Sequence, residues 1–307
     1  MARSKKKTGS KKKKPARFFS VGRLVVVFLL TVMVLLSVFA AGYVIFFRTV
    51  FAQDIPSGVS NGFIFEEPDP PVHEEQVAEG AEERRVRQEE LPMVAIIIDD
   101  LGYHQQVGDQ LLNFTLELTY SFLPFAPFTR EQESMAFYAG KTVLLHLPLE
   151  PKDLQWDSGP GTLLLKDSPE MQREKFEQDL AAVPHAVGVN NHMGSRYTED
   201  RDAMKRLLRF FDFDSLFFVD SFTTAASVGQ QVAKEIGIKT ARRNVFLDNK
   251  LDLNNICEQL ETLVDLAEKK GQAIGIGHPH QVTADALLKC TGKYSSRVQY
   301  VSIIRLL

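Results

Sequence analysis

The sequence predicts an α/β protein: a distorted (β/α)7–8 barrel preceded by one transmembrane helix. Short β-rich runs alternate with amphipathic segments from Met93 onward, which is typical of a parallel sheet with crossover helices. Seven or eight such units fit within residues 92–307. No glycine-rich phosphate loop follows the first run, so a closed or nearly closed barrel is favoured over a doubly wound sheet. A Rossmann-like sheet is the alternative fold.

The first 47 residues predict a membrane anchor. Residues 24–47 are 24 consecutive uncharged positions, which as a helix span about 36 Å, enough to cross a bilayer with some tilt. Residues 1–23 carry ten Lys or Arg and no acid, so the positive-inside rule leaves this basic tail in the cytoplasm. We expect a single-pass protein of the cytoplasmic membrane with a periplasmic or other extracytoplasmic domain. A cleaved signal peptide is the alternative, but its apolar region would be only about 7–15 residues long.

A flexible acidic linker is expected between the anchor and the domain. Residues 48–91 mix Pro, Gly and Glu without apolar periodicity, and residues 66–90 carry ten acids against three Arg. From Leu91 onward, 22 basic and 28 acidic residues leave the domain with a formal charge of −6. This balance argues against a nucleic-acid partner.

The secondary-structure pattern of the domain can be followed along the chain. Strands are expected at residues 93–98, 117–122, 142–147, 186–190, 215–219, 240–245, 273–276 and 299–303. Capping residues and apolar stripes predict helices at residues 170–183, 198–211, 228–236 and 252–270.

Polar side chains that could take part in catalysis or bind a metal follow five of these strands: Asp99 and Asp100, His146, His192, Asp220, and His278. In a parallel barrel these strand ends meet at one mouth. Helix capping is an equally good interpretation of Asp220, or of either adjacent aspartate, taken alone. Capping does not favour histidine, so for the whole set a site is preferred. A carboxylate and two neutral imidazoles supply three metal ligands and leave positions for water and substrate. The neighbouring carboxylate can then accept a proton.

Five strand-end segments resemble the divergent polysaccharide deacetylase family, a branch of the NodB-type carbohydrate esterases. They are Ile-Ile-Asp-Asp-Leu-Gly at 97–102, His-Leu-Pro-Leu-Glu-Pro at 146–151, Asn-Asn-His-Met-Gly-Ser at 190–195, Phe-Val-Asp-Ser at 218–221 and Gly-Ile-Gly-His-Pro at 275–279. The resemblance covers nearly all of residues 92–307. It implies a NodB-type distorted barrel, a divalent metal that is usually Zn²⁺, and N-acetylated polysaccharide as substrate.

The resemblance also implies residue roles. Asp99 corresponds to the catalytic base, Asp100 to the metal-binding carboxylate and His278 to the general acid. His146 stands where the NodB-type His-x-x-x-His begins, but Glu150 occupies the place of the second histidine. His192 is the preferred replacement, which makes Asp100, His146 and His192 the expected metal ligands; Glu150 is the alternative third ligand.

The expected catalytic set is Asp99, His278 and Asp220, where Asp220 would orient one of the other two. The Arg-x-Pro-x-Gly loop of typical family members is absent.

Three functions follow from these observations. The first is a metal-dependent hydrolase that deacetylates N-acetylated glycans, including peptidoglycan, in the cell envelope. The second is a catalytically silent, membrane-tethered barrel that binds glycan or an envelope protein, which the loss of the second family histidine suggests. The third is a metal-dependent hydrolase of another ester or a phosphoester. Export would permit a disulfide between Cys257 and Cys290, but two small buried side chains are at least as good an interpretation.

Overall fold

The computed structural model describes residues 29–30, 32–33, 91–211 and 216–307. The chain divides into two compact units, residues 1–61 and 62–307. In the first unit the four described residues are helical. No helix within the described ranges is both long and apolar enough to cross a bilayer. The predicted basic tail, the linker up to residue 90 and all but four residues of the predicted anchor lie outside the described residues.

The second unit is built on a nine-stranded sheet whose described pairings are all parallel. Its order is β6-β5-β4-β3-β2-β1-β8-β7, and β9 pairs with the beginning of β1. The strands are β1 (Met93–Leu101), β2 (Thr119–Phe122), β3 (Thr142–Leu149), β4 (Gly188–Met193), β5 (Phe217–Asp220), β6 (Thr240–Arg242), β7 (Val245–Phe246), β8 (Gln272–Gly277) and β9 (Gln299–Tyr300). On one side of β1 the strands follow in chain order from β2 to β6, and on the other side β8 comes next and then β7. A barrel opened between β6 and β7 has this order, and a doubly wound sheet does not.

The sheet is a curled half-barrel, and this corrects the expectation of a closed or nearly closed barrel. Strands β6 and β7 are the two edges, although only Arg243 and Asn244 separate them in sequence. The N–H of Arg243 donates to Asp220 O on the β5 side at 3.0 Å, and the N–H of Asn244 donates to Ile274 O in β8 at 2.8 Å. Consecutive residues thus bond to β5 and to β8, on opposite sides of the opening, so the chain crosses the opening without forming a β6–β7 ladder. The strand expected at 240–245 is split for the same reason.

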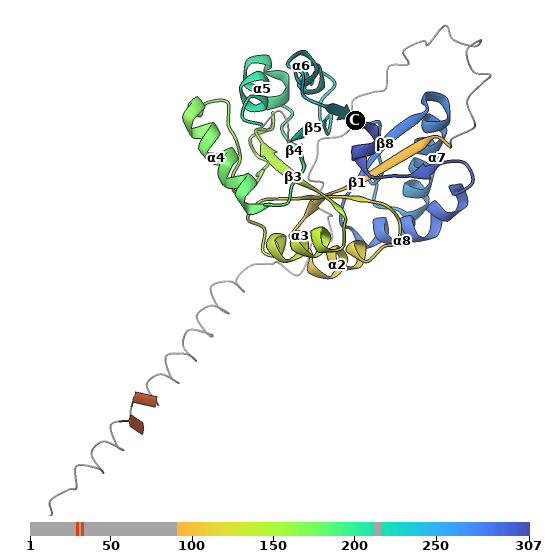
Figure 1. Cartoon of the computed structure of the whole chain (residues 1–307), viewed down its shortest axis with the longest axis horizontal. Helices are drawn as coiled ribbons and strands as arrows, with labels where there is room; N and C mark the ends of the chain where they lie inside the picture. The colour runs from red at the N-terminus through yellow and green to blue at the C-terminus, as the bar shows by residue number, and fades with distance from the viewer. Residues whose placement is uncertain (1–28, 31, 34–90, 212–215) are drawn as a thin grey trace, which may run out of the picture. The chain divides into compact units, whose positions relative to one another are not determined.

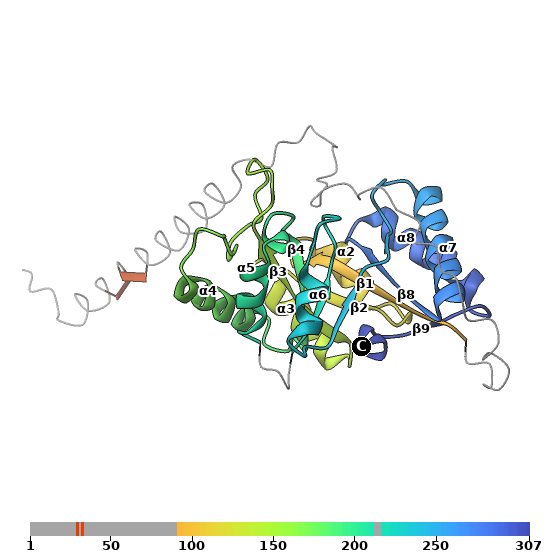
Figure 2. The same cartoon turned by 90° about the horizontal axis from the view of Figure 1, so that it is seen from above.

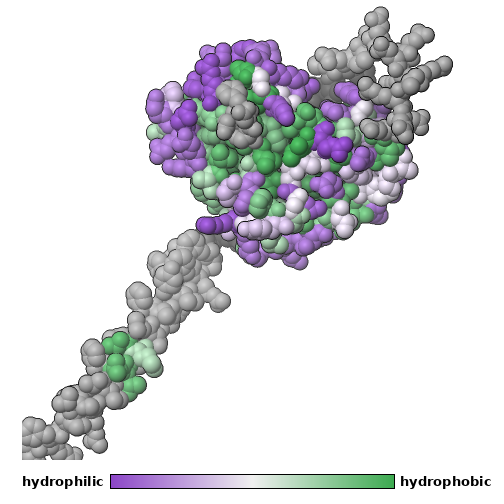
Figure 3. Space-filling view, viewed as in Figure 1, coloured by the Kyte–Doolittle hydropathy of each residue, from purple (hydrophilic) through white to green (hydrophobic). Residues whose placement is uncertain are grey.

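Helices surround the outside of the curled sheet (Figures 1 and 2). They are α2 (Gln105–Leu112), α3 (Thr129–Tyr138), α4 (Pro169–Ala182), α5 (Arg201–Leu208), α6 (Gly229–Glu235), α7 (Leu253–Lys270) and α8 (Gln281–Cys290), with short 3₁₀ turns at Tyr197–Glu199, Thr291–Tyr294 and Ile303–Leu306. In the view of Figure 3, polar side chains gather over α4, α5 and α6, as expected for helices that face water on one side.

Capping residues begin and end several helices. The side chains of Ser168, Asp200 and Asp252 each accept a backbone N–H in the first turn of α4, α5 and α7. Gly271 ends α7 in the left-handed conformation, with φ 83°. The helices expected from these signals are confirmed, with ends that differ by a few residues. Helices α2, α3 and α8 were not among them.

The strands bury two different faces. Val94, Ile96 and Ile98 of β1 belong to a large apolar cluster with the helices, while Ala95 and Ile97 belong to a smaller cluster that includes C-terminal residues but no α-helix. Side chains of a strand alternate between faces, so the smaller cluster marks the concave face of the half-barrel. The same alternation decides which strand-end side chains can meet in its mouth.

Cys257 of α7 and Cys290 at the end of α8 form a disulfide, with Cα atoms 5.8 Å apart. This settles the interpretation that the sequence left open. The bond joins α7, which packs against β8, to α8, which packs against α7.

Candidate active site

The two adjacent aspartates at the end of β1 lie in different backbone environments. The pairing of β1 with β2 shifts register between Ile98 and Leu101, and Asp100 has a left-handed φ of 54°. Asp99 follows Ala95 and Ile97 on the concave face, and strict alternation would turn Asp100 outward. The irregular backbone turns it back toward the mouth. Aspartate is among the few non-glycine residues that adopt this conformation readily.

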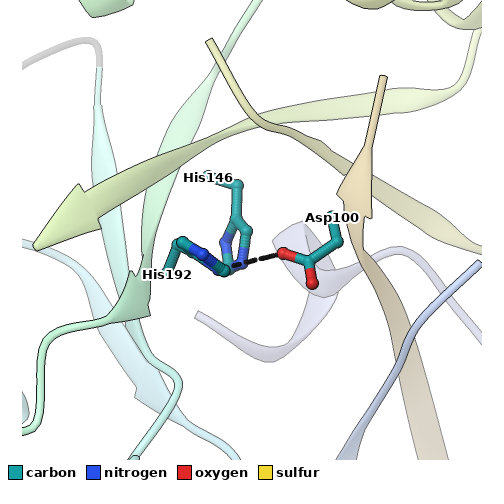
Figure 4. A group of neighbouring side chains, drawn as sticks. All are labelled: Asp100, His146 and His192. Atoms are coloured by element: carbon teal, nitrogen blue, oxygen red, sulfur yellow. Dashed lines mark ion pairs between the residues drawn. The ribbon is translucent and has the colours of Figure 1, made fainter. Parts of the chain in front are cut away.

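Asp100, His146 and His192 meet in the mouth of the half-barrel (Figure 4). Oδ1 of Asp100 lies 3.1 Å from Nε2 of His146 and 2.9 Å from Nδ1 of His192. The two imidazole ring centres are 5.0 Å apart. All three side chains are buried. Residues from β1, β3 and β4 therefore present three potential ligand atoms within 4.8 Å of one another.

The two carboxylates differ in their electrostatics. Burial disfavours ionisation of Asp100, but the attraction of His192 and the contact with His146 outweigh it and hold the pKa of Asp100 well below its usual range. For Asp99 burial prevails over the attraction of His146 and His278, and the pKa is raised. An ionised carboxylate and a more basic one thus stand side by side.

The donor set fits a divalent cation. A carboxylate oxygen and two imidazole nitrogens are typical ligands of Zn²⁺, with bonds of about 2.0–2.2 Å. Ligand atoms spaced within 4.8 Å can share such an ion. Glu150, the alternative third ligand, is engaged elsewhere: Oε1 accepts from Nη1 of Arg196 at 2.8 Å and Oε2 from the N–H of Leu165 at 2.6 Å. The structure brings His192, and not Glu150, to the other two residues.

Asn190 of β4 connects the base candidate to the imidazole cluster. Its Nδ2 donates to both carboxylate oxygens of Asp99, at 2.8 and 2.9 Å, and to Ser221 Oγ at 3.1 Å. Its Oδ1 lies 3.1 Å from Nδ1 of His146 and accepts the hydroxyl of Ser121. All five side chains are buried.

His278 faces the same pocket as Asp100. The pocket is lined by Asp100, Tyr103, His104, His278, Pro279 and His280. Nδ1 of His278 lies 2.9 Å from Oδ1 of Asp248, whose Oδ2 accepts the backbone N–H of His278 and the hydroxyl of Thr283. Burial opposes ionisation of Asp248, but the attraction and hydrogen bonds of His278 lower its pKa. The imidazole is therefore held against an ionised carboxylate.

Asp220 does not reach the mouth. Phe217 and Val219 of β5 lie in the concave cluster, so alternation turns Asp220 toward the helices. Its carboxylate accepts the N–H of Phe222 at 2.9 Å, the hydroxyl of Ser227 at 2.8 Å and the N–H of Gln230 at 3.1 Å. Within the described residues, no hydrogen bond links it to Asp99 or His278. Asp220 organises the loop before α6, and the expectation that it orients a catalytic partner finds no support in these contacts.

Four site residues were missed at the sequence level: Ser121, Asn190, Ser221 and Asp248. Asn190 lies two positions before His192, on the same face of β4, and this spacing was the available signal. Asp248 follows the short strand β7, which the sequence does not separate from β6.

Comparisons with known proteins identify the family of this chain. A family model for divergent polysaccharide deacetylases matches residues 96–307. The chain belongs to the divergent polysaccharide deacetylase family. The family expected from the strand-end segments is confirmed, and the matched range contains every candidate site residue.

Three relatives illustrate the similarity. The chain is 35% identical to YibQ, an uncharacterized protein of Escherichia coli (strain K12), over 198 residues, which are 63% of this chain and 60% of YibQ. It is 33% identical to an uncharacterized protein of Haemophilus influenzae (strain ATCC 51907 / DSM 11121 / KW20 / Rd) over 194 residues, 63% of this chain and 69% of that protein. The crystal structure of the uncharacterized protein ATU2773 from Agrobacterium tumefaciens C58 superposes with a TM-score of 0.68 and 25% identity, over 73% of this chain and 92% of that one.

Proposed function

We propose that residues 92–307 form a metal-dependent hydrolase that removes acetyl groups from N-acetylated glycans of the cell envelope. The observation that carries this proposal is the convergence of Asp100, His146 and His192 within 4.8 Å, beside a second carboxylate and a pocket that His278 lines. Membership of the divergent polysaccharide deacetylase family supports the reaction class and the substrate class.

Asp100, His146 and His192 would hold the cation, for which we propose Zn²⁺. When bound, such an ion polarises a carbonyl and lowers the pKa of water toward about 7. Asp99 would accept the proton of the attacking water; in support of this role, its Oδ2 lies 3.7 Å from Nε2 of His146, at the edge of the cluster. Its raised pKa makes it a stronger base than an exposed aspartate.

His278 would donate a proton to the departing amine. Asp248 accepts from Nδ1 and stabilises the protonated imidazole, so the proton for transfer is held on Nε2. Asp220 has no step in this reaction.

The predicted anchor supports an envelope substrate. An uncharged stretch at residues 24–47 behind a lysine-rich tail would place the domain outside the cytoplasm, where peptidoglycan and other N-acetylated glycans lie.

Acetate release by the purified full chain tests the proposal. The substrates are chitooligosaccharides and peptidoglycan fragments, and Zn²⁺ is supplied. We expect Asp99→Asn to lower kcat by about 100-fold or more, because general-base catalysis contributes at least this factor. Asp202→Asn, an exposed aspartate on α5, is the matched control and should leave the rate unchanged. Background release from wild type and Asp99→Asn alike would rule out deacetylation of these substrates.

One observation favours a second function, a catalytically silent domain that binds glycan or an envelope protein. Glu150 replaces the second family histidine and is paired with Arg196, so the family's metal-binding pattern is not retained in full. In that case His146→Ala would preserve the cellular role in a complementation assay, whereas an enzyme would lose it.

A further inference from the structure

We propose that Asn190 is a positioning residue that holds the catalytic base and a metal ligand in their working arrangement at the same time. One side of its amide orients Asp99, and the other fixes the protonation form of His146. The inference rests on the proposed function for the roles of these two partners, but part of its test is independent of turnover.

The donor side of the amide faces Asp99. Nδ2 lies 2.8 and 2.9 Å from the two carboxylate oxygens. A carboxylate accepts hydrogen bonds, so this contact assigns the NH₂ group to the Asp99 side and the carbonyl oxygen to the other. With both oxygens bonded to one nitrogen, the plane of the carboxylate is fixed beside the metal cluster.

The acceptor side faces His146. Oδ1 has no hydrogen to give, so Nδ1 of His146, 3.1 Å away, must donate to it. The neutral imidazole then carries its lone pair on Nε2, the atom that would face a cation shared with Asp100, whose Oδ1 lies 3.1 Å away. Hydrogen bonds from the far nitrogen of a histidine set its tautomer and orientation at metal sites. Asn190 therefore selects the tautomer in which His146 can bind a cation.

The fold explains why one residue can do both. Asn190 is the register partner of His146 on the adjacent strand β3. Asp99 is on β1, and β2 and β3 separate β1 from β4 in the sheet. An amide on β4 reaches β1 because the sheet curls. The hydroxyls of Ser121 on β2 and Ser221 after β5 complete the contacts of this buried side chain and restrict its rotation.

Two substitutions separate the functions of the amide. Asn190→Leu removes the donor and the acceptor. Asn190→Asp keeps an oxygen for Nδ1 of His146 but replaces the donor to Asp99 with a second carboxylate. The matched control is Asn244→Leu, which removes an amide that accepts the N–H of Ile274 at 2.8 Å, away from the mouth. Thermal unfolding of each full-length variant first establishes that it is folded.

Zn²⁺ affinity, measured by competition with a chelator, and kcat are the two readouts. For Asn190→Leu we expect a loss of affinity of roughly 10–100-fold, the range for residues that support metal ligands. For Asn190→Asp we expect affinity at least equal to that of wild type, with kcat lowered by about 100-fold and KM little changed.

Wild-type affinity in Asn190→Leu would overturn the assignment to His146. Undiminished kcat in Asn190→Asp would overturn the assignment to Asp99. If the wild-type chain releases no acetate while Asn190→Leu still binds Zn²⁺ more weakly than wild type, the proposed reaction fails and the positioning of His146 stands.

Discussion

Two adjacent aspartates of this protein have carboxyl pKa values that their surroundings shift in opposite directions. Asp99 and Asp100 are adjacent, buried and chemically identical, yet burial raises the pKa of the first and imidazole contacts lower that of the second. The difference arises because a left-handed backbone at Asp100 turns it toward His192, whereas at Asp99 burial outweighs the attraction of His146 and His278 and the hydrogen bond from Asn190. A base and a ligand can thus come from consecutive positions.

Another buried aspartate makes stability depend on pH. Asp179 on α4 is fully buried, and burial raises its pKa to about 8 against the attraction of Lys175. An aspartate in the unfolded chain titrates near 3.9. Between about pH 4 and pH 8 the folded state therefore keeps a proton that the unfolded state has released, and the free energy of unfolding falls as pH rises through this window.

We expect Asp179→Asn to raise the free energy of unfolding at pH 8 by on the order of 5 kcal/mol, the amount that corresponds to a pKa difference of about four, and to change it little at pH 4. Urea denaturation across this range, followed by the fluorescence of Trp156, measures the effect. Asp202→Asn serves as the exposed control. A variant whose stability falls with pH as steeply as wild type would show that Asp179 is not the source.

The sequence predicts the positions of most strands and helices, but only the structure shows which face of the sheet each strand side chain occupies. The strands near residues 93, 142 and 273 and the helices with capping residues are where the sequence places them. In a strand such as β5, apolar side chains occupy both faces, so the sequence cannot show which side Asp220 takes. The packing of Phe217 and Val219 in the concave cluster decides it.

The disulfide between α7 and α8 should contribute strongly to stability. Its cysteines are separated by 33 positions, and closing a loop of this length stabilises a fold by roughly 3–4 kcal/mol in the chain-entropy model. We expect Cys257→Ser with Cys290→Ser to lower the free energy of unfolding by about 3 kcal/mol. Chemical denaturation with and without a reducing agent measures this. A reductant effect that persists in the double variant would point to a cause other than this bond.

We propose a location outside the cytoplasm for residues 92–307. The disulfide in the domain and the uncharged stretch behind a basic tail both favour a domain exported across the cytoplasmic membrane. The linker expected at residues 48–91 would then join this domain to the predicted anchor.

Protease treatment of Escherichia coli spheroplasts that express the full chain tests this topology. We expect a C-terminal epitope tag to be digested in intact spheroplasts while an N-terminal tag stays protected until lysis. A cytoplasmic marker protein controls for leakage. Protection of the C-terminal tag until lysis would contradict an exported domain, and loss of the N-terminal tag would contradict a cytoplasmic basic tail.

The sequence by itself determined the α/β class, most of the strands, the family and the residue types of the site, because these follow from local hydrophobic periodicity and from short strand-end segments. Only the tertiary structure decided that the barrel stays open between β6 and β7, that His192 joins Asp100 and His146, that Asp220 turns away, and that Asn190 bridges β4 and β1. These outcomes depend on sheet curl, strand phase and backbone irregularity, which arise from contacts between segments distant in the chain.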